Sequence, residues 1–396
     1  MLAFLLAPVY IAVNVYVLRW MFRFIQACFR RFYSKWIRAV AAVLYLLICL
    51  TPLLAFLFPE SGLKTFAARI GNGWLGIFLY LVLLIAALDL IRVCARRIPV
   101  IKNRIQQPEK WLAAAGWAVI LAVAGISLYG SSNAGNIRIT KYSVSIPSES
   151  LSGQKLKIVL AADLHLGYSI GYEHVKQMVD KINDLEPDLV CLAGDIFDNR
   201  YESIGEPERI AEELSRIDSR YGVYACYGNH DYEEEILAGF TFDSGQKVQI
   251  GDKMRELLRD AGIRTLEDET VLINDSFYLA GRRDYSSEKK SGKTRKSPQE
   301  LVQGLDPEKP LIVMDHQPRE LPELADAGVD LDLCGHTHDG QLFPANIVTG
   351  LIWENAYGHQ KTGDMDHIVT SGAGIFGPYM RVGTKSEIVK ISVEFE

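Results

Sequence analysis

Four long apolar runs occupy the first third of the chain. Each approaches the roughly 20 residues that an α-helix needs to cross the hydrocarbon core of a bilayer. Basic clusters separate the runs, which favours membrane-spanning helices over helices buried in a soluble core. The pattern predicts a bundle of four transmembrane helices within residues 1–130. The runs are Leu2–Leu18, Ala39–Phe58, Trp74–Leu88 (continuing to about Ile91) and Trp111–Tyr129.

The pattern changes after residue 130. The small polar residues of Ser131–Asn136 indicate a linker, and the alternation in Ile137–Ile146 predicts a leading strand, so residues 131–154 are expected to connect two domains. Short, continuous apolar runs then alternate with charged helical stretches, which is typical of strands covered on both faces in α/β proteins. Residues 155–396 are therefore expected to form an α/β domain. Its strands are expected at Lys157–Ala162, Asp188–Ala193, Val223–Tyr227, Leu311–Met314, Leu331–Cys334 and beyond His367, and its helices near Glu173–Leu185, Pro207–Ile217, Lys253–Ala261 and Arg319–Ala327.

The charges divide the chain in the same way. Residues 1–130 hold 14 Lys and Arg against 3 Asp and Glu, and the remainder holds 28 against 45. Residues 19–38 and 92–110 contain six basic residues each, whereas the stretch between them has only Lys64 and Arg69. By the positive-inside rule the two basic loops are cytoplasmic. We therefore expect a multi-pass protein of the cell membrane whose α/β domain is extracytoplasmic.

Two further features of composition qualify this picture. Cys191, Cys226 and Cys334 lie in apolar strand-like runs, and their odd number indicates buried free thiols, a weak sign of the opposite orientation. The α/β domain is acidic and has no basic groove with interleaved aromatic residues, so nucleic acid is not an expected partner.

Polar residues follow five of the predicted strands. They come to one edge of the sheet, because ligands converge just past the carboxyl ends of strands in α/β folds. Five of the eight His residues are among them. The residues are Asp163 and His165, then Asp195, then Asn229, His230 and Asp231, then His316, and finally His336 and His338.

These side chains suit two divalent cations. Carboxylate, imidazole and amide ligands favour Mn, Fe or Zn, with no thiolate to select among them. One Asp can bridge a pair of ions, and a pair about 3.5–4 Å apart can activate a shared water for displacement at phosphorus. Each motif is weak alone. Gly335-His336-Thr337-His338 is the strongest, because alternate His residues on an extended segment seldom serve packing.

Together, the five motifs resemble the calcineurin-like metallophosphoesterase family over Lys155–Glu396. Residues Gly340–Pro344 and Ser371–Arg381 are similar to its membrane-associated bacterial branch, some members of which cleave the pyrophosphate of a nucleotide-linked glycolipid. The resemblance implies a four-layer αββα domain of two packed mixed sheets with flanking helices. It also implies two metal ions, with manganese favoured.

The resemblance assigns roles residue by residue. The first ion would be held by Asp163, His165, Asp195 and His338, and the second by Asp195 as the bridge, Asn229, His316 and His336. His230 would be the catalytic imidazole that protonates the leaving oxygen or stabilises phosphoryl charge, and Asp231 the carboxylate that orients its ring. Asp198 would lie behind the ligands or stabilise a turn.

Two basic features remain open. Arg381 is expected either to contact a substrate phosphate or to pair with a surface carboxylate. Arg282–Lys296 contains seven basic residues. It is either a solvated loop or a basic flap that holds an anionic lipid head group or the membrane surface.

The leading hypothesis is a membrane-anchored phosphoesterase that hydrolyses a phosphate ester or pyrophosphate in a membrane lipid or lipid-linked envelope precursor. Its partners would be the bilayer and that phosphate-containing lipid. One alternative is an anchored phosphodiesterase or nucleotidase that acts on soluble small molecules. The other is a non-catalytic receptor or scaffold, against which the complete ligand set argues. The sequence does not indicate an oligomeric state.

Overall fold

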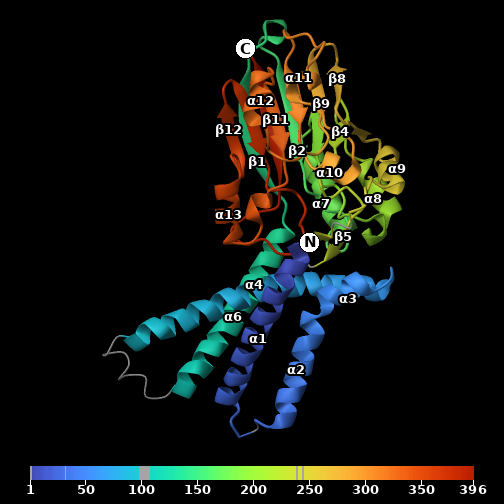
Figure 1. Cartoon of the computed structure of the whole chain (residues 1–396). Coiled ribbons are helices and arrows are strands. Elements are labelled where there is room, and N and C mark those ends of the chain that lie inside the picture. Colours follow the sequence, from blue (N-terminus) through green and yellow to red (C-terminus); the bar gives the residue numbers. More distant parts are fainter. Residues whose placement is uncertain (1, 32, 98–107, 238–239, 243–244) are drawn as a thin grey trace. The chain divides into compact units, whose positions relative to one another are not determined.

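The computed structural model describes residues 2–31, 33–97, 108–237, 240–242 and 245–396 (Figure 1). The chain forms two compact units. A helical unit comprises Met1–Ser131 with Glu235–Phe242 and Gly377–Tyr379, and a sheet unit comprises Ser132–Glu234, Asp243–Phe376 and Met380–Glu396.

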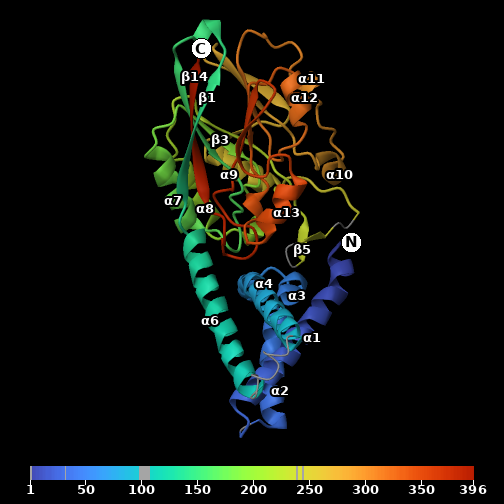
Figure 2. The ribbon, with the colours of Figure 1, turned by 90° about the vertical axis from the view of Figure 1, so that its left-hand side faces the viewer.

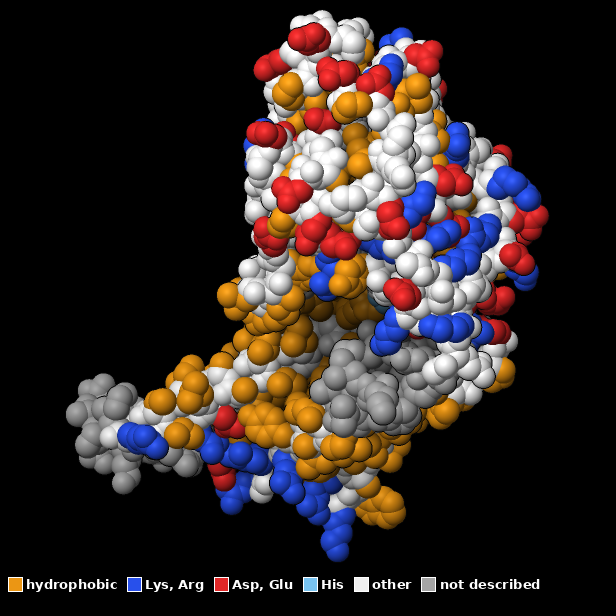
Figure 3. Space-filling view, turned by 45° about the horizontal axis from the view of Figure 1, so that its top comes forward, with side chains coloured by type: hydrophobic (Ala, Val, Ile, Leu, Met, Phe, Trp, Pro, Cys, Tyr) orange, Lys and Arg blue, Asp and Glu red, His pale blue; other side chains and the backbone are white. Residues whose placement is uncertain are grey.

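In the residues that the structure describes, two helices are long and apolar enough to cross a membrane, over Gly62–Ala95 and Glu109–Ala134. A bent pair, Lys35–Cys49 and Thr51–Leu57, would make a third if it is one span. Exposed hydrophobic side chains cover much of this unit, and Lys and Arg gather near one end of its helices (Figure 3). The helices are α1 (Leu2–Cys28), α2 (Lys35–Cys49), α3 (Thr51–Leu57), α4 (Gly62–Arg97) and α6 (Pro108–Ala134).

The prediction of four spanning helices is thus supported only in part. The predicted run Ala39–Phe58 is broken at Leu50, where α2 and α3 meet at a bend of 48°. Pro52 lies in the first turn of α3, where its missing N–H is tolerated, and it interrupts the hydrogen bonds of a longer helix. The run Leu2–Leu18 lies within α1, which is not among the spans found in the described residues.

The expected linker is also different. Residues 131–134 continue α6 as helix, because Asn133 is buried and finds partners in the sheet unit. Its Nδ2 donates to the carbonyl oxygens of Arg381 (3.0 Å) and Thr384 (2.8 Å), and its Oδ1 accepts from Arg138 (2.9 Å). Only residues 135–137 separate α6 from the first strand.

The sheet unit contains two mixed six-stranded sheets, which confirms the predicted α/β class. The first has the order β1 (Arg138–Ile146), β14 (Glu387–Phe395), β2 (Lys155–Ala161), β3 (Leu189–Ala193), β4 (Val223–Cys226) and β7 (Arg264–Thr265). The second has the order β12 (Gly358–Thr362), β13 (Met365–Val369), β11 (Leu331–Cys334), β10 (Leu311–Met314), β9 (Phe277–Gly281) and β8 (Glu269–Ile273). A short hairpin, β5 (Glu235–Leu237) with β6 (Phe240–Phe242), belongs to the helical unit.

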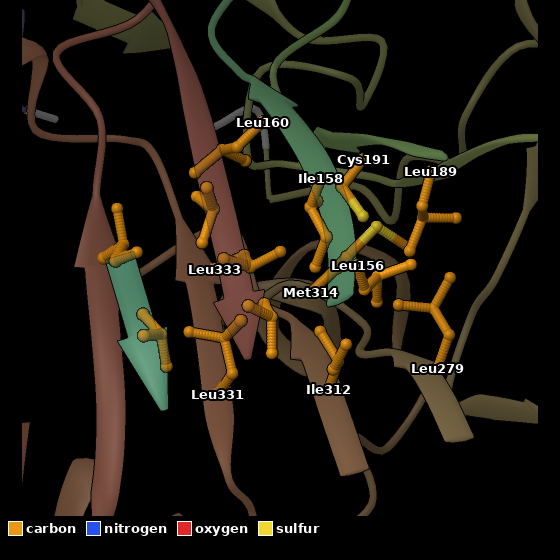
Figure 4. Packing of buried hydrophobic residues seen from close by; sticks show 14 of the residues in the cluster. Leu156, Ile158, Leu160, Leu189, Cys191, Leu279, Ile312, Met314, Leu331 and Leu333 are labelled. Carbon is orange, nitrogen blue, oxygen red and sulfur yellow. The ribbon is translucent and has the colours of Figure 1, made fainter. Parts of the chain in front are cut away.

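The two sheets pack face to face over a continuous apolar core. Leu156, Ile158 and Leu160 alternate along β2 and meet side chains from β10 and β11, including Ile312 and Leu333 (Figure 4). Figure 2 shows α7 and α8 beside the first sheet and α11 and α12 beside the second. Both faces of the central strands are therefore covered, which explains their continuous apolar sequences. The remaining elements are α7 (Tyr172–Asn183), α8 (Pro207–Leu214), α9 (Asp252–Asp260), α10 (Ser287–Ser291), α11 (Pro298–Leu301), α12 (Leu321–Asp326), α13 (Ala345–Ile352) and the 3-10 turns η1 (Glu149–Leu151), η2 (Tyr201–Ser203) and η3 (His338–Gly340).

The basic segment Arg282–Lys296 is solvated only in part: Lys289, Lys293 and Lys296 are exposed, but other basic residues are held by carboxylates. Arg282 is fully buried and contacts the carboxylates of Asp315 (3.0 Å) and Glu320 (2.9 Å). Arg295 pairs with the same two acids, which holds its pKa above the ordinary value against the effect of burial. Lys290 pairs with Glu234 and donates to the carbonyl of Asn229 (2.9 Å). These three cations are already paired within the protein.

Candidate metal centre

The predicted ligands converge at the carboxyl ends of the central strands. Asp163 and His165 follow β2, Asp195 follows β3, and His336 and His338 follow β11. All five have positive φ, between 49° and 73°. Left-handed backbone is unfavourable for residues with a Cβ and is found where surrounding structure imposes it, often at functional sites. The fold thus uses strained backbone to turn these side chains toward one another.

Two glycines let the loops approach this closely. A Cβ at Gly228 would lie 2.2 Å from Asp195 Oδ1, and a Cβ at Gly335 would lie 2.7 Å from Asp163 Oδ2. Any larger residue would push the carboxylates out of place. The glycines beside Asn229 and His336 therefore have a steric role in forming the site.

The first cluster contains Asp163, His165 and His338, and its ligand atoms lie within 4.8 Å of one another. The Nε2 atoms of the two imidazoles are 3.0 Å apart, and His338 Nε2 is 3.7 Å from Asp163 Oδ1. The His336 N–H donates to both oxygens of Asp163, at 2.9 and 3.1 Å, and fixes the carboxylate. Burial raises the pKa of Asp163 to about 6.

The second cluster contains Asp195, His316 and His336, again within 4.8 Å. The Nδ1 of His316 lies 2.9 Å from the carbonyl oxygen of Ala193. A carbonyl only accepts, so Nδ1 carries the hydrogen. Nε2 faces Asp195 Oδ2 at 3.1 Å and His336 Nδ1 at 3.2 Å. A metal-ligating imidazole requires this arrangement, with one ring nitrogen donating to the protein and the other directed into the site.

Asp195 lies between the clusters. Its Oδ2 is 3.1 Å from His316 Nε2 and 3.8 Å from His165 Nε2, and its Oδ1 accepts from the His230 N–H at 2.7 Å. Burial would raise the pKa of this carboxyl, but nearby imidazoles, His316 foremost, hold it well below the usual value. The effect is reciprocal: despite burial, Asp195 raises the pKa of His316 well above its usual value. A charged carboxylate at the shared position is what a bridging ligand requires.

The donor atoms fit a pair of divalent ions. Asn229 Oδ1 is buried and has no hydrogen-bond partner. Buried polar atoms without a partner are costly and require an explanation, such as an ion. Asp198 Oδ1, also without a hydrogen bond, lies 3.8 Å from His165 Nδ1, so it stands behind that ligand. An oxygen and nitrogen donor set without thiolate suits Mn, Fe or Zn.

Asn199, which the sequence did not indicate, contacts the ring of His230. Its Oδ1 is 2.6 Å from His230 Nδ1, and its Nδ2 donates to the carbonyl of Tyr232 (3.3 Å). Because Nδ2 must face that carbonyl, Oδ1 faces the imidazole, and Nδ1 carries the hydrogen. Burial lowers the pKa of His230 to about 4. The ring is therefore neutral, with an unprotonated Nε2.

Asp231 does not have the orienting position expected for it. Its carboxylate accepts from the backbone N–H groups of Phe197 (2.8 Å) and Gly228 (2.6 Å), and so joins the loops after β3 and β4. Burial, and then the charge on Asp195, raise the pKa of Asp231 to about 7. Among the described contacts, Asn199 takes the place predicted for Asp231.

Arg381 is also placed differently from both expectations. It is fully buried, and its guanidinium donates to the carbonyl oxygens of Ser371 (2.5 Å), Gly374 (2.9 Å), His338 (3.1 Å) and Gly372 (3.3 Å). All of these acceptors belong to loops that border the first cluster. Arg381 thus supports the backbone of His338, a predicted ligand.

Two aromatic residues border the site without having been predicted. The ring of Phe376 lies 4.5 Å from that of His230 and 5.3 Å from that of His165, measured between centroids. The ring of Trp353 lies 5.0 Å from that of His336. Isolated aromatic residues far along the chain carry no sequence signal that would assign them to a metal site.

Comparisons with known proteins agree with this geometry. The family model for the calcineurin-like phosphoesterase matches residues 156–340. An uncharacterised metallophosphoesterase of Aquifex aeolicus is 30% identical over 262 residues, which cover 65% of this chain and 92% of that protein. A transmembrane protein with metallophosphoesterase domain from Danio rerio is 27% identical over 75% of this chain and 68% of its own length.

A third relative has a named activity. The UDP-2,3-diacylglucosamine pyrophosphatase LpxG of Chlamydia trachomatis is 22% identical over 52% of this chain and 70% of its own length. The region matched by the family model includes the strand-end motifs that form the two clusters. The chain belongs to the calcineurin-like phosphoesterase family.

Proposed function

We propose that this protein is a membrane-anchored, metal-dependent phosphoesterase that hydrolyses a phosphate ester or pyrophosphate bond in a membrane lipid or lipid-linked envelope precursor. The observation that carries the proposal is the pair of buried clusters joined at Asp195, together with the partnerless Oδ1 of Asn229. Helices long enough to cross a bilayer support the anchoring. A relative named as a pyrophosphatase of a diacylated nucleotide sugar supports the substrate class.

Two ions would be held by the residues that the two clusters bring together. Asp163, His165 and His338 would hold one ion, His316, His336 and Asn229 the other, and Asp195 both. When bound, the ions would supply Lewis-acid polarisation of phosphoryl oxygens and a water of lowered pKa. Manganese is our first choice among Mn, Fe and Zn.

His230 is proposed as the group that transfers a proton at Nε2. The neutral ring has Nδ1–H held by Asn199, so Nε2 alone is free to exchange a proton with the substrate. A bound phosphate would raise the pKa of the imidazole again, because the anion favours the protonated ring. The protonated Nε2 would then donate to the leaving oxygen. Phe376, packed against the ring, would exclude water.

We further propose that the chain crosses the membrane more than once and that the sheet unit is extracytoplasmic. This proposal rests on the distribution of Lys and Arg: residues 19–38 and residues 92–110 contain six each, and the stretch between them contains two. An outward-facing site would act on outer-leaflet lipids or released envelope products.

His230→Ala tests the catalytic assignment. The detergent-purified chain, loaded with Mn²⁺, is expected to hydrolyse bis-p-nitrophenyl phosphate and to lose activity in chelator. The variant should retain its metal and lose roughly two to four orders of magnitude in kcat with a poor leaving group, and less with a good one. A variant that lost its metal would contradict the role given to His230.

A matched pair of substrates distinguishes an enzyme that acts on a lipid from one that acts on a soluble small molecule. Cytidine diphosphate diacylglycerol and cytidine diphosphate glycerol contain the same pyrophosphate, and only the first has acyl chains. The lipid reading predicts a kcat/KM at least about tenfold higher for the lipid, since buried methylenes add binding energy. Equal values would favour a soluble substrate, and no turnover of any phosphoester would favour a non-catalytic role.

A further inference from the structure

Helix α13, Ala345–Ile352, is an apolar helix that the sheet unit does not bury. None of its residues is buried and none is charged. Leu351 is 83% exposed and Ile352 68% exposed, and Phe343 just before the helix is half exposed. Of the eight large hydrophobic residues exposed in the described part of the sheet unit, five lie in residues 343–352. Single exposed hydrophobic residues are ordinary, but such a cluster indicates a binding surface.

The exposed side chains share one side of the helix. Ile347 and Leu351 are four residues apart, as are Val348 and Ile352, and residues at this spacing are neighbours on a helix surface. A continuous aliphatic strip thus runs along α13. We call the strip, together with Phe343, the α13 face.

The α13 face leads directly to the metal centre. Trp353, the next residue, places its ring 5.0 Å from the ring of His336. The guanidinium carbon of Arg319 lies 4.5 Å from the Trp353 ring and 4.8 Å from the ring of Tyr285. An aliphatic surface, an aromatic residue and a cation therefore follow one another toward the site.

The guanidinium of Arg319 is available to bind an anion. Its Nε donates to Gln317 Oε1 at 3.1 Å, and no carboxylate pairs with it in the described parts of the chain. The three paired cations of Arg282–Lys296 described above are held by carboxylates, so Arg319 differs from them. Stacking on two aromatic rings favours a guanidinium over other cations and leaves its terminal nitrogens for an anion.

We propose that the α13 face inserts among the acyl chains of membrane phospholipids, with Arg319 binding the lipid phosphate beside the metal centre. The bilayer is the occupant that the chain itself makes available, since only residues 135–137 separate strand β1 from α6, a helix able to cross a membrane. A charge-free aliphatic strip bordered by tryptophan and arginine is typical of elements at the membrane interface. The charge of Arg319 complements an anionic lipid phosphate.

This inference rests on the proposed function only where it places a lipid phosphate at the metal centre. Contact between the α13 face and acyl chains requires no turnover. The membrane contact and the proposed function can therefore fail separately, and the first experiment below does not depend on activity.

Cross-linking tests the contact directly. The full chain carries p-benzoylphenylalanine in place of Leu351 and is reconstituted in vesicles of phosphatidylglycerol and phosphatidylethanolamine. Leu272 on β8, 41% exposed, provides the matched control position. After irradiation, mass spectrometry is expected to show lipid adducts at position 351 at least tenfold above those at 272. Adducts mainly with protein at 351, from this chain or a second copy, or lipid adducts no more frequent than at 272, would overturn the proposal.

A second measurement covers the phosphate contact. Leu351→Ser with Ile352→Ser should lower kcat/KM for cytidine diphosphate diacylglycerol about tenfold and leave that for cytidine diphosphate glycerol unchanged. Arg319→Gln should lower both, because both substrates have the anion. An equal loss on both substrates in the α13 variant would count against acyl contact, and unchanged values in Arg319→Gln would count against the phosphate contact.

Discussion

Replacing Arg381 by methionine removes a buried guanidinium that donates to four backbone carbonyls around the first cluster. Each buried acceptor left without a donor costs about 1–3 kcal/mol. The carbonyls of His338 and Gly372 keep backbone donors from Gln341 and Glu387, at 2.9 Å each, so only those of Ser371 and Gly374 lose their donor. At about 2 kcal/mol each, the two losses sum to about 4 kcal/mol. Burial lowers the pKa of Arg381 to about 10, from 12.5, so removing the charge relieves about 3 kcal/mol. The net loss of stability is therefore only about 1 kcal/mol.

A loss of that size should be small but measurable in thermal unfolding. At roughly 2–4 °C per kcal/mol for a domain of this size, the Tm of the sheet unit should fall by about 2–4 °C. Metal affinity should fall about 10–100-fold, because Arg381 fixes the backbone of His338. Differential scanning calorimetry of the detergent-purified chain and metal analysis after dialysis measure both effects.

Arg319→Met is the control, because it removes an exposed arginine close to the same site. It should leave the Tm and metal content unchanged and raise KM for anionic substrates. If Arg381→Met instead kept its Tm and metal and raised only KM, the buried supporting role would be wrong, and direct substrate contact would be restored.

Three other predictions concern proton transfer, stability and topology. Asn199→Asp places a carboxylate beside the imidazole of His230. About 4 kcal/mol of attraction at an effective dielectric of 20 should raise the pKa of His230 by roughly two to three units. A profile of kcat/KM against pH that did not move between pH 4 and 9 would contradict this. Burial raises the pKa of Asp330 to about 6, so the folded state holds this proton more tightly than the unfolded chain, and stability falls as pH rises from about 4 to 6. Asp330→Asn, whose Oδ1 can still accept from Leu311, should therefore be more stable than the parent protein, by a free energy of unfolding that grows over that window to at most about 3 kcal/mol. A difference in stability that stayed constant with pH would refute this. A reporter fused after Glu396 should be active only in its extracytoplasmic version, and activity of the cytoplasmic version alone would reverse the proposed orientation.

The ligands could be predicted because two simple patterns coincide. Parallel strands buried on both faces read as continuous apolar runs, and the residue after each run lies at the shared edge of the sheet. Leu331–Cys334 illustrates this: the strand is found at the predicted residues, and His336 and His338 follow it into separate clusters. Such information is local, so a sequence contains it.

Roles that depend on contacts between loops could not be predicted. Asn199 and His230 are 31 residues apart, and only the packing of their loops brings them within 2.6 Å. The adjacent Asp231 was the natural expectation, but its carboxylate is taken by two backbone N–H groups. Arg381 has the same sequence signal whether exposed or buried, because its acceptors are carbonyls that any residue type supplies.

The membrane segment shows the limits of composition. Ala39–Phe58 is apolar throughout, so its mean hydropathy does not reveal the break at Leu50; Pro52 was the available signal. The polar composition of Ser131–Asn136 suggested a loop, but Asn133 satisfies its amide within the sheet unit and the helix continues. In both cases a specific residue outweighed the average of its neighbours.

The central claim is a two-ion centre joined by Asp195, and metal stoichiometry tests it most directly. The detergent-purified full chain is stripped with chelator, titrated with Mn²⁺, and assayed by mass spectrometry for bound metal and with bis-p-nitrophenyl phosphate for turnover. We predict two equivalents per chain with activity that requires both, and loss of both ions and of activity in Asp195→Ala, since that carboxylate contacts each cluster. Full turnover without metal, or normal metal content and turnover in Asp195→Ala, would contradict the account.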